Sequence, residues 1–353
     1  MKAIRTESYA VYFSTDGYRA LKEHLMATPY SQVFLLTDTH TSRYCYPKLL
    51  QVFPEAATWT QLSIPAGEAH KNIDSCLTAW KNLSEAGADR KSLLVNLGGG
   101  VVTDLGGFVA STYQRGIDFI HIPTTLLAMV DASVGGKTGV DLGNLKNQIG
   151  VINHPAQVLI DPDYLQTLER RELRSGFAEM LKHGLIRDAA YWEELAALGM
   201  EQVDMTHIYR SVQLKNEVVL QDPTEQNLRK ILNFGHTLGH ALESCFLNSK
   251  VTEPLLHGEA IAIGMVLEAY LSVSACGLPR RDCDAIRETV LSIYPRVDIT
   301  RQQREEIGSL LMHDKKNAFG RINFSLLEQI GRATYNREVT PAQIAQSFDY
   351  YAE

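Results

Sequence analysis

The sequence predicts a parallel-sheet α/β domain followed by a mostly α-helical domain. Up to about Pro162, short apolar runs of strand length alternate with segments whose apolar residues recur every three or four positions. That alternation is typical of a parallel sheet with helices on both faces. Beyond Pro162, long helical patterns follow one another directly. At 353 residues the chain has room for two domains, which we expect at residues 1–165 and 166–353.

The strands of the first half are expected where a buried apolar run is stopped by a polar residue, a glycine or a proline. They are Ser31–Thr37, Thr58–Ile64, Ser92–Leu97 and Asp118–Ile122. Helices are expected between them at residues 42–52 and 73–87, the second with a glycine near its end, where a C-cap is typical. A further helix should begin after the three glycines Gly98–Gly100.

The second half is expected to be helical almost throughout. The predicted helices are Arg170–Gly199, Thr206–Gln221, Asn233–Phe246, Gly258–Ala275 and Arg280–Ile293. Arg321–Leu327 is the segment that alternates as a strand does. Thr340 and Pro341 supply an N-cap and a first-turn proline, so a last helix should cover residues 340–350.

Composition and charge exclude several classes of protein. With 34 Lys and Arg against 41 Asp and Glu, and no basic block, the chain is a poor partner for nucleic acid or an anionic membrane. We see no apolar run approaching the ~20 residues that cross a bilayer, and no signal-peptide core at the N-terminus. Five cysteines without a CxxC pair indicate reduced thiols. We therefore expect a cytoplasmic protein.

A glycine turn in the first half is a candidate phosphate-binding site. Gly98–Gly100 joins a buried strand to a helix, and such a turn lets backbone N–H groups approach a phosphate closely. Asp38 ends an earlier strand, where a carboxylate would meet ribose hydroxyls. A second loop, Pro65–Lys71, offers Glu68 and Lys71. The alternative is a tight turn and a surface loop without a ligand.

The stretch 122–150 combines glycines with polar residues in an otherwise apolar context. These residues are Thr124, Thr125, Asp131, Lys137, Lys146 and Asn147. The two threonines follow a strand end, the usual ligand side of a parallel sheet. A flexible Gly-rich loop with two lysines and an asparagine suits a phosphate-bearing substrate. The GGKT run lacks the spacing of a nucleotide-triphosphate loop, because Asp131 stands where the first glycine belongs.

A histidine-rich segment predicts a metal site. His236 and His240 are four residues apart, on one face of a helix. His257 opens the next helical segment, and Glu179 lies three residues before Lys182. Two imidazoles and one carboxylate, with water or substrate completing the shell, form a zinc-type catalytic site. Three histidines compete for the two places beside the glutamate. The HxxxH spacing lacks the Glu of HExxH, which argues against a metalloprotease.

Taken together, these segments resemble the 3-dehydroquinate synthase family of sugar-phosphate cyclases. The resemblance runs across nearly the whole chain and is densest at GGGVVTDLGGFVASTYQRGI, IPTTLLAMVDASVGGKTGV, LKNQIG, RSGFAEMLKHGLI, DPTEQNLRKILNFGHTLGHALE and LHGEAIAIGM. It implies a Rossmann-like NAD-binding domain, a helical metal-binding domain and a carbon–oxygen lyase of the shikimate pathway. Two departures are Thr103, where the commoner form has glycine, and Asp141-Leu142-Gly143, which replaces a more usual Asn-containing run.

The resemblance also implies roles for individual residues. Zn²⁺ or Co²⁺ would be bound by Glu179, His236 and His257, with His240 as a nearby proton shuttle. The substrate phosphate would be held by Lys137, Asn147 and Arg115, the last from the partner subunit of a homodimer. Its carboxylate would meet Arg229 and Lys315, with Lys316 as the alternative to Lys315. Other substrate contacts would be Asp131, Lys146, Lys182, Lys215, Glu225 and Asn233. The NAD⁺ contacts would be Asp38, Glu68, Lys71, Gly99, Gly100, Val101, Val102, Thr103, Asp104, Thr124, Thr125 and Thr167, together with Lys137 and Lys146.

The implied substrate is a sugar-acid phosphate, 3-deoxy-D-arabino-heptulosonate 7-phosphate. It would pass through NAD-dependent oxidation, phosphate elimination, reduction and intramolecular aldol closure to 3-dehydroquinate. Related cyclases that use substrates without a carboxylate remain an alternative, as does a metal-dependent polyol dehydrogenase. Arg229, Asn233 and Lys315 favour the acid substrate, because a buried carboxylate needs charged partners. Helical periodicity predicts that Arg229, Asn233 and His236 lie near one helix face.

Overall fold

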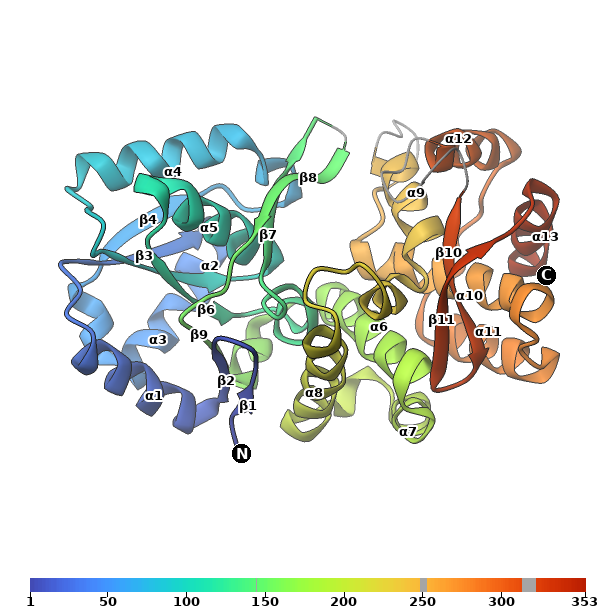
Figure 1. Cartoon of the computed structure of the whole chain (residues 1–353), viewed down its shortest axis with the longest axis horizontal. Coiled ribbons are helices and arrows are strands. Elements are labelled where there is room, and N and C mark those ends of the chain that lie inside the picture. The colour runs from blue at the N-terminus through green and yellow to red at the C-terminus, as the bar shows by residue number, and fades with distance from the viewer. Residues whose placement is uncertain (144, 248–252, 313–321) are drawn as a thin grey trace. The chain divides into compact units, whose positions relative to one another are not determined.

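The computed structural model describes residues 1–143, 145–247, 253–312 and 322–353, and the chain forms two compact units (Figure 1). Unit 1 is Met1–Glu169 and unit 2 is Arg170–Glu353. The expected boundary at residue 165 falls within the last turn of unit 1, Pro162–Thr167.

Unit 1 is built on a seven-stranded sheet in the order β1-β2-β9-β6-β5-β3-β4. The strands are β1 Ile4–Arg5, β2 Ala10–Phe13, β3 Val33–Asp38, β4 Thr60–Ile64, β5 Leu93–Gly98, β6 Asp118–Pro123 and β9 Gln157–Ile160. The β1–β2 pair is antiparallel and the other pairs of this sheet are parallel. The predicted α/β class is therefore confirmed.

Helices lie on both faces of the unit 1 sheet (Figure 1). They are α1 Ser14–Ala27, α2 Thr39–Tyr44, α3 Tyr46–Val52, α4 Ile73–Glu85 and α5 Gly100–Thr112. The core between the sheet and α4 and α5 contains Phe34, Leu94, Leu105 and Phe119. A parallel sheet covered on both faces has near-continuous apolar strands, which explains why the sequence revealed β3, β4, β5 and β6. The short strands β1, β2 and β9 were not predicted.

In two segments of unit 1 the secondary structure differs from the prediction. The expected helix at residues 42–52 is two helices, because Pro47 stands in the first turn of α3 and requires a new helix start. The expected flexible Gly-rich loop is an antiparallel hairpin of β7 Lys137–Leu142 and β8 Leu145–Ile152. Its glycines Gly139 and Gly150 face each other, and a Cβ on either one would collide with the opposite backbone. They serve close strand pairing.

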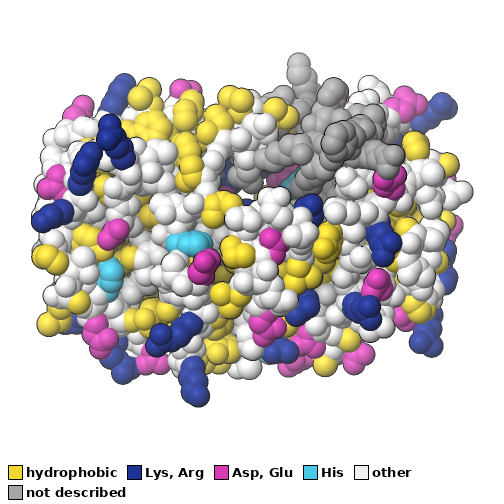
Figure 2. All heavy atoms as spheres, viewed as in Figure 1, with side chains coloured by type: hydrophobic (Ala, Val, Ile, Leu, Met, Phe, Trp, Pro, Cys, Tyr) yellow, Lys and Arg dark blue, Asp and Glu magenta, His cyan; other side chains and the backbone are white. Residues whose placement is uncertain are grey.

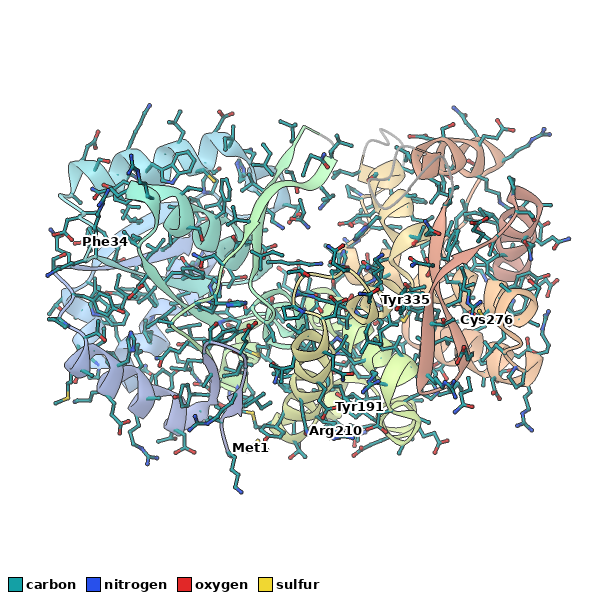
Figure 3. The ribbon with its side chains drawn as sticks, in the orientation of Figure 1. Met1, Phe34, Tyr191, Arg210, Cys276 and Tyr335 are labelled. Carbon is teal, nitrogen blue, oxygen red and sulfur yellow. The ribbon has the colours of Figure 1, made fainter. Side chains whose placement is uncertain are left out.

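Unit 2 is mainly helical, with one two-stranded hairpin. Its helices are α6 Arg170–Arg187, α7 Ala189–Leu198, α8 Met205–Gln221, α9 His236–Leu247, α10 His257–Cys276, α11 Arg280–Ile293, α12 Arg301–Met312 and α13 Pro341–Ala352, and its strands are β10 Asn323–Gln329 and β11 Arg332–Glu338. The single helix expected at residues 170–199 ends at Asp188, whose side chain accepts from the Tyr191 N–H and caps α7. Arg210 of α8 pairs with that carboxylate, and it lies close to Tyr191 (Figure 3).

The central helix of unit 2 corrects one expectation. We saw no apolar run long enough to cross a bilayer, yet α10 has the length and hydropathy of such a helix. Its apolar window is 72% buried, against α6, α9, α11, α13 and β10, so its hydropathy is explained by burial within the protein.

Candidate metal and nucleotide sites

Three residues from three helices of unit 2 converge on one point. Glu179 lies in the middle of α6 and is fully buried, while His236 begins α9 and His257 begins α10. The Glu179 Oε1 atom is 3.4 Å from His236 Nε2 and 3.5 Å from His257 Nε2. These separations are close to the ~3.4 Å between ligands of a tetrahedral zinc site with bonds of ~2.0–2.1 Å.

The other ring nitrogen of each histidine has its own partner. His236 Nδ1 is 3.1 Å from the Phe234 carbonyl oxygen, and His257 Nδ1 is 3.3 Å from Glu243 Oε2. An Nδ1–H donated to an oxygen fixes the tautomer and directs Nε2 outward, the usual arrangement of metal-binding histidines. The donor set therefore fits a divalent cation.

His240 belongs to the same cluster. Its ring centre lies 5.1 Å from that of His236 and 5.7 Å from that of His257. Ligand atoms of the three histidines lie within 4.8 Å of one another. The structure thus brings together all three histidines and the glutamate singled out in the sequence.

Two charged groups complete this cluster. The Lys182 ammonium group contacts Glu179 Oε2, and both side chains are buried. Burial alone would lower the pKa of His257, but hydrogen bonds and charge from Glu179 and Glu243 raise it to about 10. Without a cation, His257 is therefore protonated at neutral pH, and a bound cation would displace that proton.

Close approach of the helices places these residues. A Cβ at Gly258 would overlap the Ser175 carbonyl of α6, so glycine there lets the start of α10 contact α6. Gly264 meets the Gly235 carbonyl in the same way. The buried Glu268 carboxylate accepts from the backbone N–H groups of Gly235 and Leu238, which fixes the start of α9.

The single helix expected around Arg229, Asn233 and His236 is not formed. Leu228–Asn233 is a 3₁₀ turn, and α9 begins only after Gly235, whose φ is +78°. The left-handed backbone of Gly235, whose N–H donates to Glu268, separates the 3₁₀ turn from α9. Helical spacing therefore does not relate Arg229 and Asn233 to His236.

Several predicted substrate residues of unit 2 are nevertheless held in place by the protein. Arg229 is 2% exposed, which excludes a solvated helix residue, and its Nη1 donates to the Pro223 carbonyl at 2.6 Å. Asn233 donates to Glu225 at 2.6 Å, and Lys215 of α8 is buried. Lys315 and its alternative Lys316 lie outside the described residues.

In unit 1 the glycine turn forms as predicted. Gly99 is the N-cap of α5, so the first turn of that helix contains Gly100, Val101, Val102 and Thr103. The Thr103 hydroxyl donates to the carbonyls of Gly99 and Gly100 at 3.2 Å. The side chain is thereby turned back onto its own helix, which shows how threonine is accommodated in place of glycine.

The other predicted nucleotide residues lie at or just beyond the carboxyl ends of parallel strands. Asp38 ends β3, where it accepts from the His40 and Thr41 N–H groups and caps α2. Thr124 follows β6 and donates its N–H to the Gly98 carbonyl. Thr125 follows it, and Thr167 closes the last turn of the unit.

The loop after β4 is joined to the β7–β8 hairpin by an ion pair and a hydrogen bond, and to α5 by a second ion pair. Lys146 Nζ is 2.6 Å from Glu68, and Lys71 Nζ is 2.6 Å from both Asp104 and the Asn147 side-chain oxygen. Burial would lower the pKa of Lys71, but the surrounding carboxylates, Asp104 foremost, raise it above its ordinary value. Predicted nucleotide residues and predicted substrate residues thus contact each other directly.

The remaining predicted residues of unit 1 lie in three other segments of the unit. Lys137 begins β7 and is exposed, whereas Asp131 is half-buried in the helical turn Ala128–Ala132. Arg115 is exposed in the turn after α5 and has a φ of +76°.

Sequence reasoning missed several acidic residues that position the predicted ones. They are Asp141, Asp222, Glu243 and Glu268. Glu243 stands within the quoted motif NFGHTLGHALE, seven residues after His236, so its helical spacing was a usable signal. The sequence contained no such signal for Glu268, because it lies in the apolar helix α10, far along the chain from the residues Gly235 and Leu238 that it holds.

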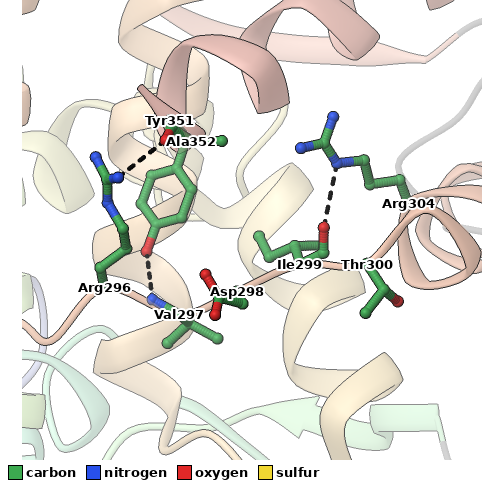
Figure 4. Close-up of a pocket in the computed structure, with 8 residues that line it drawn as sticks. All are labelled: Arg296, Val297, Asp298, Ile299, Thr300, Arg304, Tyr351 and Ala352. Carbon is green, nitrogen blue, oxygen red and sulfur yellow. Dashed lines mark hydrogen bonds between the residues drawn. The ribbon is translucent and has the colours of Figure 1, made fainter.

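A pocket in unit 2 lies between the start of α12 and α13 (Figure 4). Its polar groups bind the protein itself: Arg296 donates to the Ala352 carbonyl, Tyr351 accepts from the Val297 N–H, and Arg304 donates to the Ile299 carbonyl. Of the residues that the structure describes, its lining includes none of the predicted site residues. The contacts of Arg296 and Val297 with Ala352 and Tyr351 attach α13 to the rest of unit 2.

Comparison with known proteins matches both units. Residues 61–175 match the 3-dehydroquinate synthase N-terminal model and residues 176–317 the C-terminal model. The chain is 42% identical to a 3-dehydroquinate synthase from Parabacteroides distasonis, over 97% of this chain and 98% of that one. It is 37% identical to one from Thermoanaerobacter pseudethanolicus, over 94% of each chain.

Solved structures share the fold. The 2-epi-5-epi-valiolone synthase from Streptomyces hygroscopicus, with NAD⁺ and Zn²⁺ bound, superposes with a TM-score of 0.85 at 28% identity, covering 100% of this chain and 99% of that one. A 2-deoxy-scyllo-inosose synthase complexed with carbaglucose-6-phosphate, NAD⁺ and Co²⁺ also gives 0.85, at 23% identity, over 98% and 99%. An iron-containing alcohol dehydrogenase from Thermotoga maritima gives 0.67 at 14% identity, over 99% and 98%. The last two comparisons establish the fold alone.

Proposed function

Because the chain belongs to the 3-dehydroquinate synthase family, we propose that it converts 3-deoxy-D-arabino-heptulosonate 7-phosphate to 3-dehydroquinate and phosphate. The observation that carries this proposal is 42% identity over nearly the full length of a relative of that name. The cluster of Glu179 with three histidines, at the positions expected for this chemistry, supports it.

The metal ligands are proposed to be Glu179, His236 and His257. The two Nε2 atoms face one carboxylate oxygen, and both rings are held by their Nδ1 partners, as catalytic metal sites require. The sequence-related valiolone synthase is described with NAD⁺ and Zn²⁺, so we propose the same pair here, with Co²⁺ as the alternative metal. When bound, NAD⁺ would accept and return the hydride, and the cation would act as a Lewis acid.

The residues of unit 1 are proposed to bind NAD⁺ and the substrate phosphate. The start of α5 offers backbone N–H groups to the pyrophosphate, and Asp38 offers a carboxylate to the ribose. Lys137, Asn147 and Arg115 would hold the phosphate group that leaves, with Lys146 beside them. Their task is position and charge, since the departing phosphate can itself take the neighbouring proton.

The residues of unit 2 are proposed to hold the sugar acid. Arg229 is a fixed, buried cation suited to a carboxylate. Lys182, Lys215, Glu225 and Asn233 would contact the hydroxyl groups, with Asp131 from unit 1, while His240 moves protons near the metal. Lys315 keeps its proposed role at the carboxylate.

We further propose a cytoplasmic homodimer in which Arg115 serves the neighbouring subunit. Exposed apolar side chains of unit 1 support a partner surface: Ile73 and Leu77 of α4 and Leu142 and Leu145 of the hairpin are 40–52% exposed, and hydrophobic side chains gather over this part of the unit (Figure 2). Arg115, exposed in a turn with left-handed backbone, is accessible to a second chain.

One assay tests the proposal against its alternatives. The metal-loaded enzyme with NAD⁺ should release phosphate from the heptulosonate phosphate, form 3-dehydroquinate and show no net gain of NADH absorbance. Accumulating NADH would indicate a polyol dehydrogenase instead. Efficient turnover of sedoheptulose 7-phosphate, which has no carboxylate, would indicate a related cyclase, the class that shares this fold at a TM-score of 0.85.

A further inference from the structure

The β7–β8 hairpin contains an irregularity that places Asp141 beside Asn147. The strand pairing shifts between the pairs Val140–Ile149 and Leu142–Leu145: Asp141 alone separates them in β7, whereas residues 146–148 separate them in β8, so the bulge lies in β8 and contains Asn147. Bulges redirect side chains and are frequent beside functional sites. Here the bulge redirects Asn147, and the Asp141 carboxylate opposite it accepts from the Asn147 backbone N–H at 2.6 Å.

Asn147 needs such support because its backbone is left-handed. Its φ is +49°, a conformation that costs energy for residues other than glycine and that Asn adopts more readily than most. A charged acceptor on the N–H stabilises this conformation through a short, charge-assisted hydrogen bond.

The consequence of that conformation is the direction of the Asn147 side chain. Its amide oxygen accepts from Lys71 Nζ at 2.6 Å, and the same ammonium group contacts Asp104 at 2.6 Å. Asp141 also donates its own backbone N–H to the Lys71 carbonyl at 2.8 Å and forms a parallel bridge with Asn72. Asp141 is therefore tied both to Asn147 and to the segment that presents Lys71.

We propose that Asp141 is a positioning residue for substrate phosphate binding, acting through the left-handed backbone of Asn147. With the amide oxygen accepting from Lys71, the amide nitrogen of Asn147 would be the donor to a phosphate oxygen. This inference rests on the proposed function, because it takes Asn147 as a phosphate contact. It also gives a role to the Asp141-Leu142-Gly143 run, which departs from the commoner pattern of the family.

The test compares Asp141→Ala, which removes the acceptor, with Asp141→Asn, which keeps an uncharged one. We expect Asp141→Ala to raise KM for the heptulosonate phosphate about tenfold, as for one lost charge-assisted hydrogen bond, with a smaller effect on kcat. The Asp141→Asn variant should stay within about threefold of wild type. Gln148→Ala, an exposed position in the same hairpin, is the matched control and should change neither constant.

A double-mutant cycle tests whether Asp141 acts through residue 147. Glycine adopts the left-handed conformation without support, so Asp141→Ala should have almost no further effect in an Asn147→Gly background. Additive effects of the two substitutions would overturn the proposal. A KM of Asp141→Ala within about twofold of wild type, which is less than one lost hydrogen bond should cause, would also overturn it. So would a KM of Asp141→Asn raised as much as that of Asp141→Ala.

Binding measurements separate this inference from the proposed function. Calorimetry with inorganic phosphate, in the presence of NAD⁺, should show weaker binding to Asp141→Ala by about tenfold and little change in NAD⁺ affinity. If the wild type makes no 3-dehydroquinate, the proposed function fails whatever these values are. If the wild type is active and Asp141→Ala binds phosphate normally, only the role of Asp141 fails.

Discussion

At the scale of single residues, the structure distinguishes two glutamates of the metal cluster: Glu179 is a proposed ligand, and Glu243 orients the ligand His257. Glu179 faces both Nε2 atoms, whereas Glu243 contacts the far nitrogen of His257. Glu179→Gln should therefore lower metal affinity by more than about 100-fold, and Glu243→Gln by about 10–100-fold, the range for partners behind a ligand.

Bound zinc measured on the purified, folded variants would check this order. Because Lys182 loses its charged partner in Glu179→Gln, the thermal midpoint should fall as well. Full stoichiometric zinc in Glu179→Gln would contradict the ligand assignment, and equal losses in the two variants would contradict the distinction between them.

A second residue prediction concerns acid stability. His121 of β6 is buried in unit 1, and desolvation lowers its pKa from 6.5 to about 3. The unfolded chain therefore binds a proton that the folded state rejects, so the free energy of unfolding falls as the pH drops from 6.5 toward 3. The slope is about 1.4 kcal/mol per pH unit, or about 2 kcal/mol between pH 6.5 and 5.

His121→Leu removes that titration. Urea unfolding at pH 7 and pH 5 should show a smaller acid loss in the variant than in the wild type, by about 2 kcal/mol. The lost contact with Asn96 lowers stability at both pH values and so cancels in the comparison. Equal acid sensitivity of the two proteins would show that His121 is not the buried neutral group inferred here.

At the scale of elements, glycines decide where helices can meet. A Cβ at Gly258 would overlap the Ser175 backbone, whereas one at Gly308 of α12 would meet no atom of the described residues within 4 Å. Gly258→Ala should destabilise the protein by about 1–3 kcal/mol or more, because the overlapping atom is rigid. Gly308→Ala should stabilise it by about 0.4–1 kcal/mol.

Thermal unfolding of both variants, with bound metal measured in parallel, would check this pair. Gly258→Ala should also lose metal, since His257 begins the helix that is displaced. A Gly258→Ala protein as stable and as metal-rich as Gly308→Ala would contradict the packing of α10 on α6.

Most buried elements were predictable. The strands β3, β4, β5 and β6 and the helices α4, α11 and α13 follow apolar periodicity or caps, whereas β9, although buried, is only four residues long and was not predicted. The β7–β8 hairpin and β11 are exposed on much of their surface, so their sequences lack a buried face to read. The residues of the metal cluster were found through several separate motifs and through the resemblance to a family, whereas the contacts of Asp141 and Glu268 depend on the hairpin and on helix packing and required the tertiary structure.

At the scale of the whole molecule, the proposed homodimer makes a quantitative prediction. If Arg115 serves the partner's site and Lys137 serves its own, a mixed dimer of Arg115→Ala and Lys137→Ala chains has one intact site and one doubly altered site. Random exchange makes half of the dimers mixed, so activity should recover to about a quarter of wild type.

Subunit exchange followed by the phosphate-release assay would measure this recovery. If both residues served the same chain's site, the mixed dimer would contain no intact site. A fully exchanged mixture that stays inactive would therefore exclude the shared site, and a monomer in sedimentation analysis would exclude the dimer itself.

The convergence of α6, α9 and α10 on Glu179 has a consequence for how this protein matures. The three proposed ligands are far apart in the chain, so bringing them together requires long loops to close before any cation can be held. Cation binding can then stabilise only a unit 2 whose helices are already assembled. In small zinc domains, by contrast, metal binding and folding are one event. The metal content per chain therefore reports on helix assembly. A preparation with less than one cation per chain either was given too little metal or contains chains whose helices have not packed together.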